Sequence, residues 1–169
     1  MFLLVEGDFL YIPTLSEELV SNLYIELGIT NPNDINIDFI CYSRNITYTE
    51  IPMHSHYLIT SKNEKYIFVD SRLNKIKKRE HFFHEWTHVE LHEGNQTSLP
   101  YNLFIKQEND ANNLSQYALI PFHMLNHIDF YSDNIVNEVK ETFNVSTKTC
   151  VDRLSQIKRR VSDDYRTLC

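Results

Sequence analysis

The sequence HFFHEWTHVELHEG at residues 81–94 decides the fold and contains the pattern His84-Glu85-x-x-His88. Residues four apart lie on one face of a helix, about 6 Å apart along its axis. Two imidazoles at that spacing can bind one metal ion, and a glutamate beside them can reach a water molecule on that ion. We therefore interpret His84 and His88 as metal ligands and Glu85 as a catalytic base.

The neighbouring residues favour a helix with one face in the core and the other lining a cleft. The apolar stripe consists of Phe82, Phe83, Trp86 and Val89, and the opposite stripe of His81, His84, Glu85, His88 and His92. His92 lies about 12 Å along the axis from His84, too far for both to join His88 on one tetrahedral ion. We expect His92 and His81 to be part of the cleft wall or the helix surface.

A catalytic zinc ion takes three protein ligands and leaves one position for water. The next predicted helix, 103–119, offers Glu108 and Asp110. Asp110 lies about 200° around the helix from Glu108, so only one of them can face the ion. We predict Glu108 as the third ligand and Asn112, four residues later, as a supporting hydrogen-bond acceptor.

The first half of the chain predicts one helix followed by short strands. Residues 14–27 form an amphipathic pattern in which Leu15, Leu19, Leu23 and Leu27 recur every four residues, and Gly28 marks the end. Segments rich in Ile, Tyr, Phe, Thr and Val then predict a small, mainly antiparallel sheet, with a hairpin tip at residues 62–64. The predicted strands are 35–41, 46–51, 57–61 and 65–70.

The chain is predicted to be mostly helical from residue 75 onward, which gives an α+β fold class. The expected helices are 75–93, 103–119, 132–143 and 146–164; Gly94, Pro121 and Asn144 mark helix ends, and Ser146 is the N-cap of the last. With 169 residues, 3 Gly and 5 Pro, the chain indicates a single domain without a flexible linker. We expect a core over 1–130 and a helical segment, available for partner docking, over 131–169.

The formal charge of −7 argues against a phosphate backbone as the main partner. The 3 cysteines are far apart and form no Cys-x-x-Cys pair, which indicates free thiols. The apolar start is too short for a signal peptide and no segment reaches membrane-spanning length, so we expect a cytoplasmic protein.

Basic residues gather in the last predicted helix. They are Lys148, Arg153, Lys158, Arg159 and Arg160. A solvated helix face is the preferred interpretation, and a docking surface for an acidic partner or DNA is the other.

Three blocks in order resemble the ImmA/IrrE family of metallo-endopeptidases: HEWTHVELH at 84–92, ENDANNLSQYALIP at 108–121 and, more weakly, FNVSTKTCVDRL at 143–154. The resemblance covers residues 57–160. The resemblance implies a zincin-like fold, a zinc ion and a protein substrate. That substrate is a helix-turn-helix repressor whose cleavage derepresses a mobile element or stress regulon. Leu114 and Ser115 stand where the family commonly has Phe-Ala, and Asn112 where related proteases often carry Asp, which would weaken water activation.

If the site assembles as expected, Glu85 takes a proton from water and passes it to the leaving amine, while a further donor stabilises the oxyanion. The candidates for that donor are His92, Tyr101, Tyr117 and His123. Three alternatives remain open. The first is a non-catalytic zincin-like regulator that binds a repressor or DNA. The second is a deformylase-like amide hydrolase, although the cysteine ligand of that class is absent. The third is a protein whose histidine helix is purely structural.

Overall fold

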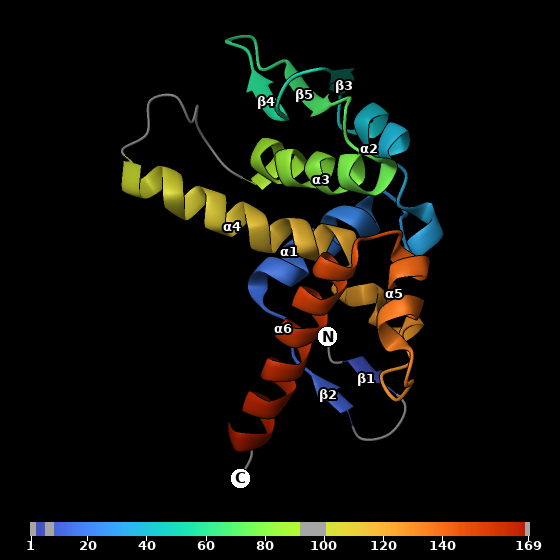
Figure 1. Ribbon diagram of the computed structural model, residues 1–169. Coiled ribbons are helices and arrows are strands. Elements are labelled where there is room, and N and C mark those ends of the chain that lie inside the picture. Colours follow the sequence, from blue (N-terminus) through green and yellow to red (C-terminus); the bar gives the residue numbers. More distant parts are fainter. Residues whose placement is uncertain (1–2, 6–8, 92–100, 168–169) are drawn as a thin grey trace. The chain divides into compact units, whose positions relative to one another are not determined.

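The computed structural model describes residues 3–5, 9–91 and 101–167, and the chain forms two compact units (Figure 1). One unit combines Met1–Asp34 with Gln116–Cys169, and we call it the terminal unit. The other is Ile35–Ser115, and we call it the central unit. Helices dominate and the sheets are small, which confirms the α+β class. The single domain expected from the sequence stays a prediction.

A three-stranded sheet forms one layer of the central unit. Its strands are β3 (Ile46–Ile51), β4 (His56–Ile59) and β5 (Lys65–Asp70), in the order β3-β5-β4. β4 and β5 form an antiparallel hairpin, and Asn63 at the predicted tip adopts a left-handed φ of 61°. β3 pairs with β5 in parallel, so the sheet is mixed, whereas a mainly antiparallel sheet was predicted. Local sequence patterns locate strands, but the choice of partner depends on non-local packing.

The predicted strand over residues 35–41 is wrong, because this segment forms helix α2 (Ile37–Ser43). The Asn36 side chain accepts a hydrogen bond from the backbone N–H of Phe39 at 3.0 Å, which is a helix N-cap. Ile40 and Cys41 are buried, while Tyr42 is exposed, so one helix face packs inward. The β-branched composition suggested a strand, but the cap and the packing of this face favour a helix.

Helix α3 (Lys75–Leu91) packs on the sheet of the central unit. It begins after Asn74, whose side chain accepts from the N–H of Lys77 at 3.0 Å. Ile67 and Val69 of β5 are fully buried, as are the aromatic residues predicted for the apolar stripe of α3. Helix α4 (Tyr101–Leu119) follows and ends before Pro121, as expected. Its residues up to Ser115 belong to the central unit.

The terminal unit holds the two ends of the chain. Its elements are β1 (Leu3–Val5), β2 (Phe9–Tyr11), α1 (Leu15–Glu26), the 3-10 helices η1 (Pro32–Asp34) and η3 (Phe122–His127), α5 (Ile135–Phe143) and α6 (Thr147–Thr167). β1 and β2 form an antiparallel hairpin. The turn between α5 and α6 has Asn144 in the left-handed region, and the Ser146 hydroxyl accepts from the N–H of Thr149 at 3.3 Å. The cap expected at Ser146 is therefore confirmed.

Helix α1 is confirmed, but its buried face is not the leucine stripe. Thr14 and Glu17 form a capping box, and Gly28 has a φ of 73° just after the helix, a conformation that favours glycine. Leu15 is 85% exposed and Leu19 47%. The buried face carries Glu17 instead, together with Val20, Ser21 and Tyr24.

The buried face of α1 is explained by an ion pair with α6. Arg153 Nη2 lies 2.6 Å from Glu17 Oε1, and both side chains have no exposed surface. The Tyr11 hydroxyl donates to the same carboxylate at 2.6 Å, and Thr14 donates its backbone N–H at 2.8 Å. A carboxylate satisfied in this way can occupy the core side of a helix, so leucine spacing alone identified the wrong face.

The basic residues of α6 do not form one surface. Arg153 is fully buried with Glu17, and Arg160 donates to the carbonyl of Ile12 at 3.2 Å. Lys148 pairs with Asp152 at 2.6 Å. Neither a single solvated basic face nor a single docking surface therefore describes this cluster.

Among the helices in the described part of the chain, we find none with the length and apolar character needed to cross a lipid bilayer.

Candidate metal centre

Helix α3 carries the histidine pair and is held to the rest of the central unit along its length. Phe82, Phe83 and Trp86 have no exposed surface. Near the C-terminal end, the buried carboxylate of Glu90 binds Arg44 at 2.6 Å and Lys65 at 2.7 Å. These contacts tie α3 to the end of α2 and the start of β5, so the histidine face has a fixed orientation.

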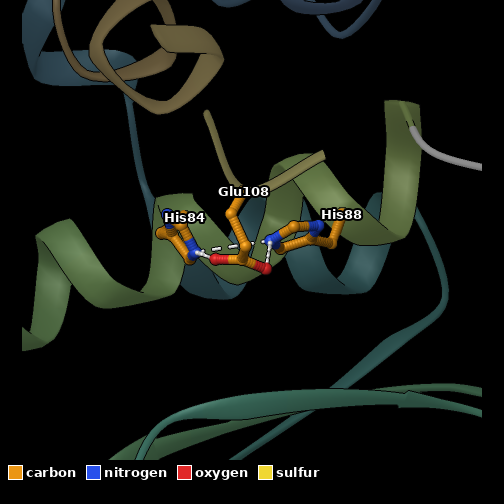
Figure 2. Close-up of side chains that lie close together, drawn as sticks. All are labelled: His84, His88 and Glu108. Atoms are coloured by element: carbon orange, nitrogen blue, oxygen red, sulfur yellow. Dashed lines mark hydrogen bonds and ion pairs between the residues drawn. The ribbon is translucent and has the colours of Figure 1, made fainter. Parts of the chain in front are cut away.

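Three side chains from α3 and α4 meet in the central unit: His84, His88 and Glu108 (Figure 2). The Nε2 atoms of the two imidazoles are 3.3 Å apart. Glu108 Oε2 lies 3.3 Å from His84 Nε2, and Glu108 Oε1 lies 3.3 Å from His88 Nε2. The three ligand atoms considered together lie within 4.8 Å of one another. The structure thus brings together the three residues predicted as ligands.

This arrangement suits a small divalent cation. Tetrahedral ligands at Zn–N and Zn–O distances of about 2.0–2.1 Å are separated from one another by about 3.3 Å. The two imidazole nitrogens are separated by that distance, and each lies at the same distance from one of the two Glu108 oxygens. Imidazole nitrogens and a carboxylate oxygen are also the donors that zinc accepts in catalytic sites. The residues present therefore fit a zinc ion, which would be held by His84, His88 and Glu108.

The two imidazoles have different surroundings. The His88 side chain is 1% exposed, whereas that of His84 is 23% exposed. The Tyr57 ring of β4 stacks on His88 with centroids 5.2 Å apart and planes inclined by 13°. His84 lies edge-on to His88 at 5.0 Å. His88 is therefore the enclosed member of the pair, and His84 the more open one.

Glu85 is buried beside the three residues, with 8% of its surface exposed. Burial raises the pKa of its carboxyl group to about 8, and the negative charge of Glu108 acts in the same direction. A carboxyl group with a raised pKa is a stronger base once ionised. Strong perturbation of this kind is typical of functional sites.

The other predicted site residues are not among the three whose ligand atoms converge in the described part of the chain. The Asn112 side chain is exposed and makes no hydrogen bond with His84, His88 or Glu108. His92 and the side chain of Tyr101 lie outside the described residues. Tyr117 and His123 belong to the terminal unit.

Each of these last two residues has a partner in the terminal unit. The Arg153 guanidinium lies over the Tyr117 ring at 4.7 Å, and His123 Nε2 is 3.1 Å from the carbonyl oxygen of Ile29. Their role as oxyanion donors stays a prediction, as does the supporting role of Asn112.

Sequence reasoning missed two contacts of the histidine helix, the stack of Tyr57 on His88 and the ion pairs of Glu90. Tyr57 belongs to a predicted strand, but nothing in its local pattern indicates contact with His88. Glu90 follows the second histidine by two residues, and its binding to Arg44 and Lys65 depends on distant segments. The available signal was the position of Glu90, an acidic residue on the apolar side of the predicted helix. An acid buried at such a position requires a cation.

Comparisons with known proteins place the chain in a family. A family model described as the IrrE N-terminal-like domain, Peptidase_M78, matches residues 42–155, more than half of the chain and all three residues of the centre. A Bacillus subtilis (strain 168) protein described as "Uncharacterized protein YqaB" is 26% identical over 148 residues, which cover 86% of each chain. The "Phage-like element PBSX protein XkdA" of the same organism is 29% identical over 150 residues, 85% of this chain and 73% of that protein.

Proposed function

The chain belongs to the Peptidase_M78 family of IrrE N-terminal-like domains, and from this premise we propose that it is a zinc-dependent endopeptidase. Its ligands are His84, His88 and Glu108. The observation that supports the proposal is the convergence of two imidazoles and one carboxylate at 3.3 Å separations. Membership of this family supports a metallopeptidase-like domain. The identity of the ion, the roles of the ligands and the substrate belong to the proposal.

The residues of this chain divide the chemistry between them. When bound, a zinc ion supplies a Lewis acid that polarises a carbonyl group and makes water acidic enough to react near neutral pH. Glu85 lies beside the ligands without being one of them, so its carboxylate accepts the proton of the attacking water. The same carboxyl group then delivers that proton to the leaving amine. The enclosed position of Glu85 limits competition from bulk water.

The substrate that we propose is a helix-turn-helix repressor, whose cleavage derepresses a mobile element or a stress regulon. Two observations support it: the resemblance to the ImmA/IrrE endopeptidases and the similarity to a protein named for a phage-like element. A repressor is found where transcription occurs, so a cytoplasmic location is part of the proposal.

Co-expression with the cognate helix-turn-helix repressor tests the substrate. We expect the repressor to be cut under the inducing signal by the wild-type protein. The variant Glu85→Gln should lower cleavage by about 10²–10⁴-fold, the usual contribution of a general base, because the amide cannot accept the proton. It should keep the zinc content of the wild type. An intact repressor in the presence of the zinc-loaded wild-type protein would reject the substrate.

The same variant separates the enzyme from a regulator that binds without cleaving. If derepression survives in Glu85→Gln, the protein acts by binding and the catalytic proposal fails. The ligand set is tested by the metal content of His88→Ala and Glu108→Ala beside wild type. Both variants should lose stoichiometric zinc, whereas His81→Ala, which removes an exposed histidine one turn earlier, should retain it.

A further inference from the structure

Tyr57 lies on the side of β4 that faces helix α3. It is paired with Ile67 of β5 across the antiparallel ladder, and directly opposed residues share a face of the sheet. Ile67 is completely buried, and the hydroxyl oxygen of Tyr57 is shielded from solvent. The next residue, Leu58, has the opposite orientation and is 46% exposed. The ring of Tyr57 therefore enters the layer between the sheet and the histidine helix.

The stack of Tyr57 on His88 limits how that imidazole can turn. With centroids 5.2 Å apart and planes inclined by 13°, a rotation of the His88 ring about its χ2 bond would drive its edge into the phenol ring. The stack fixes the plane of the ring, and in the observed orientation His88 Nε2 lies 3.3 Å from both His84 Nε2 and Glu108 Oε1. His84 is 23% exposed and has no comparable stack among the described residues.

We infer that Tyr57 is a positioning residue that holds the His88 imidazole in the orientation required for metal binding. The inference rests on the proposed zinc site and adds to it a residue from the sheet. The aromatic ring of Tyr57 supplies this positioning of His88, because stacking depends on the ring and not on the hydroxyl group. Groups that orient metal ligands typically change metal affinity by about 10–100-fold, and a stack should act at the lower end of that range.

The test compares Tyr57→Leu, which keeps apolar volume without an aromatic plane, with Tyr57→Phe, which keeps the ring. Leu58→Ala on the same strand is the matched control, because its side chain faces away from α3. Zinc affinity is measured by competition with a chromophoric chelator, and ligand geometry by the visible absorption spectrum of the cobalt-substituted protein. In metal-free protein, NMR of the histidine ring protons reports the ring-current shift that Tyr57 imposes on His88.

We expect Tyr57→Leu to lower zinc affinity by about tenfold, to change the cobalt spectrum and to remove the ring-current shift. Tyr57→Phe and Leu58→Ala should resemble wild type in all three measurements. Wild-type affinity in a folded Tyr57→Leu would overturn the inference, and so would equal losses in Tyr57→Leu and Tyr57→Phe.

Failure of the proposed function looks different. In that case wild-type protein binds neither zinc nor cobalt, and the ring-current shift in metal-free protein still tests whether Tyr57 fixes the His88 ring. A wild-type protein that binds zinc beside a Tyr57→Leu variant that binds it equally well rejects only the role of Tyr57.

Discussion

Glu17 of the terminal unit and Glu85 of the central unit are both buried glutamates, but their surroundings act on them in opposite directions. Burial alone would raise the pKa of Glu17, yet the Arg153 charge and the hydrogen bonds from Thr14 and Tyr11 outweigh it and hold that pKa below its usual value. For Glu85, burial and the charge of Glu108 together raise the pKa to about 8.

The difference separates a cluster that balances its own charges from one that does not. Around Glu17, the fold itself supplies the cation and the donors, so the charges are balanced without any other species. Around Glu85, two carboxylates and two imidazoles gather, and the ligand atoms of three of them converge as though on a cation. We expect the first cluster to control the stability of the protein and the second to control what it binds.

The largest effect on stability should follow from Arg153→Met. The change leaves the Glu17 carboxylate buried without its cation, which typically costs about 3–5 kcal/mol of unfolding free energy. Urea unfolding followed by circular dichroism measures it. Adding Glu17→Gln to the same chain should recover most of the loss, because the amide is neutral, its oxygen can accept from the Thr14 N–H, and its NH2 group can donate to the Tyr11 hydroxyl. An Arg153→Met variant as stable as wild type would mean that the ion pair between Glu17 and Arg153 does not stabilise the fold.

Zinc should stabilise the wild-type protein by binding to His84, His88 and Glu108. A ligand that binds only the folded state at 100 times its dissociation constant adds about 2.7 kcal/mol to the unfolding free energy. Urea unfolding is measured once in the presence of zinc and once in the presence of a chelator, and the two unfolding free energies are compared. His88→Ala should gain nothing from zinc. An equal gain in this variant would place the ion elsewhere.

The pH dependence of stability should report the Glu17 cluster. Because the pKa of Glu17 is lower in the folded state, its contribution is fully present above the unfolded pKa of about 4.3 and is lost as the pH falls through the folded value. Each unit of difference between the two pKa values corresponds to about 1.4 kcal/mol. Unfolding free energies measured from pH 6 to pH 3 should therefore fall more steeply for wild type than for the Glu17→Gln, Arg153→Met variant. Equal slopes would contradict this linkage.

The smallest effect is expected for Glu108→Gln in metal-free protein. The Glu108 side chain is 29% exposed, and its charge raises the pKa of Glu85, so removing that charge should change the unfolding free energy by no more than about 0.5 kcal/mol. Urea unfolding in chelator tests this. With zinc present, the variant should lose most of the stabilisation that wild type gains. A loss of about 2 kcal/mol in the metal-free protein would show that Glu108 holds the fold together.

Local signals in the sequence predicted much of the helical structure. Caps and stops act over four residues or fewer, so Gly28 located the end of α1, and Asn144 with Ser146 located the turn between α5 and α6. The apolar stripe of α3 was also predicted, because three aromatic residues on one helix face have few alternatives to burial.

Predictions failed where the deciding partner lies far away in the sequence. The leucine spacing of α1 suggested a buried stripe, but Arg153 selects the face that carries Glu17. The segment at 35–41 is an exception, because it has the composition of a strand and the local cap at Asn36, which favours a helix together with the burial of Ile40, was missed. The parallel pairing of β3 with β5 likewise joins segments whose local patterns contain no information about each other.

The sequence by itself determined that two histidines four residues apart share one face of a helix whose opposite face is apolar, because helical geometry fixes that relation within a single turn. Only the tertiary structure decided that Glu108 meets this pair, that Tyr57 stacks on one of its rings, and that a basic residue of α6 is buried against a glutamate of α1. These contacts join segments distant along the chain, and the packing of the whole chain selects among them.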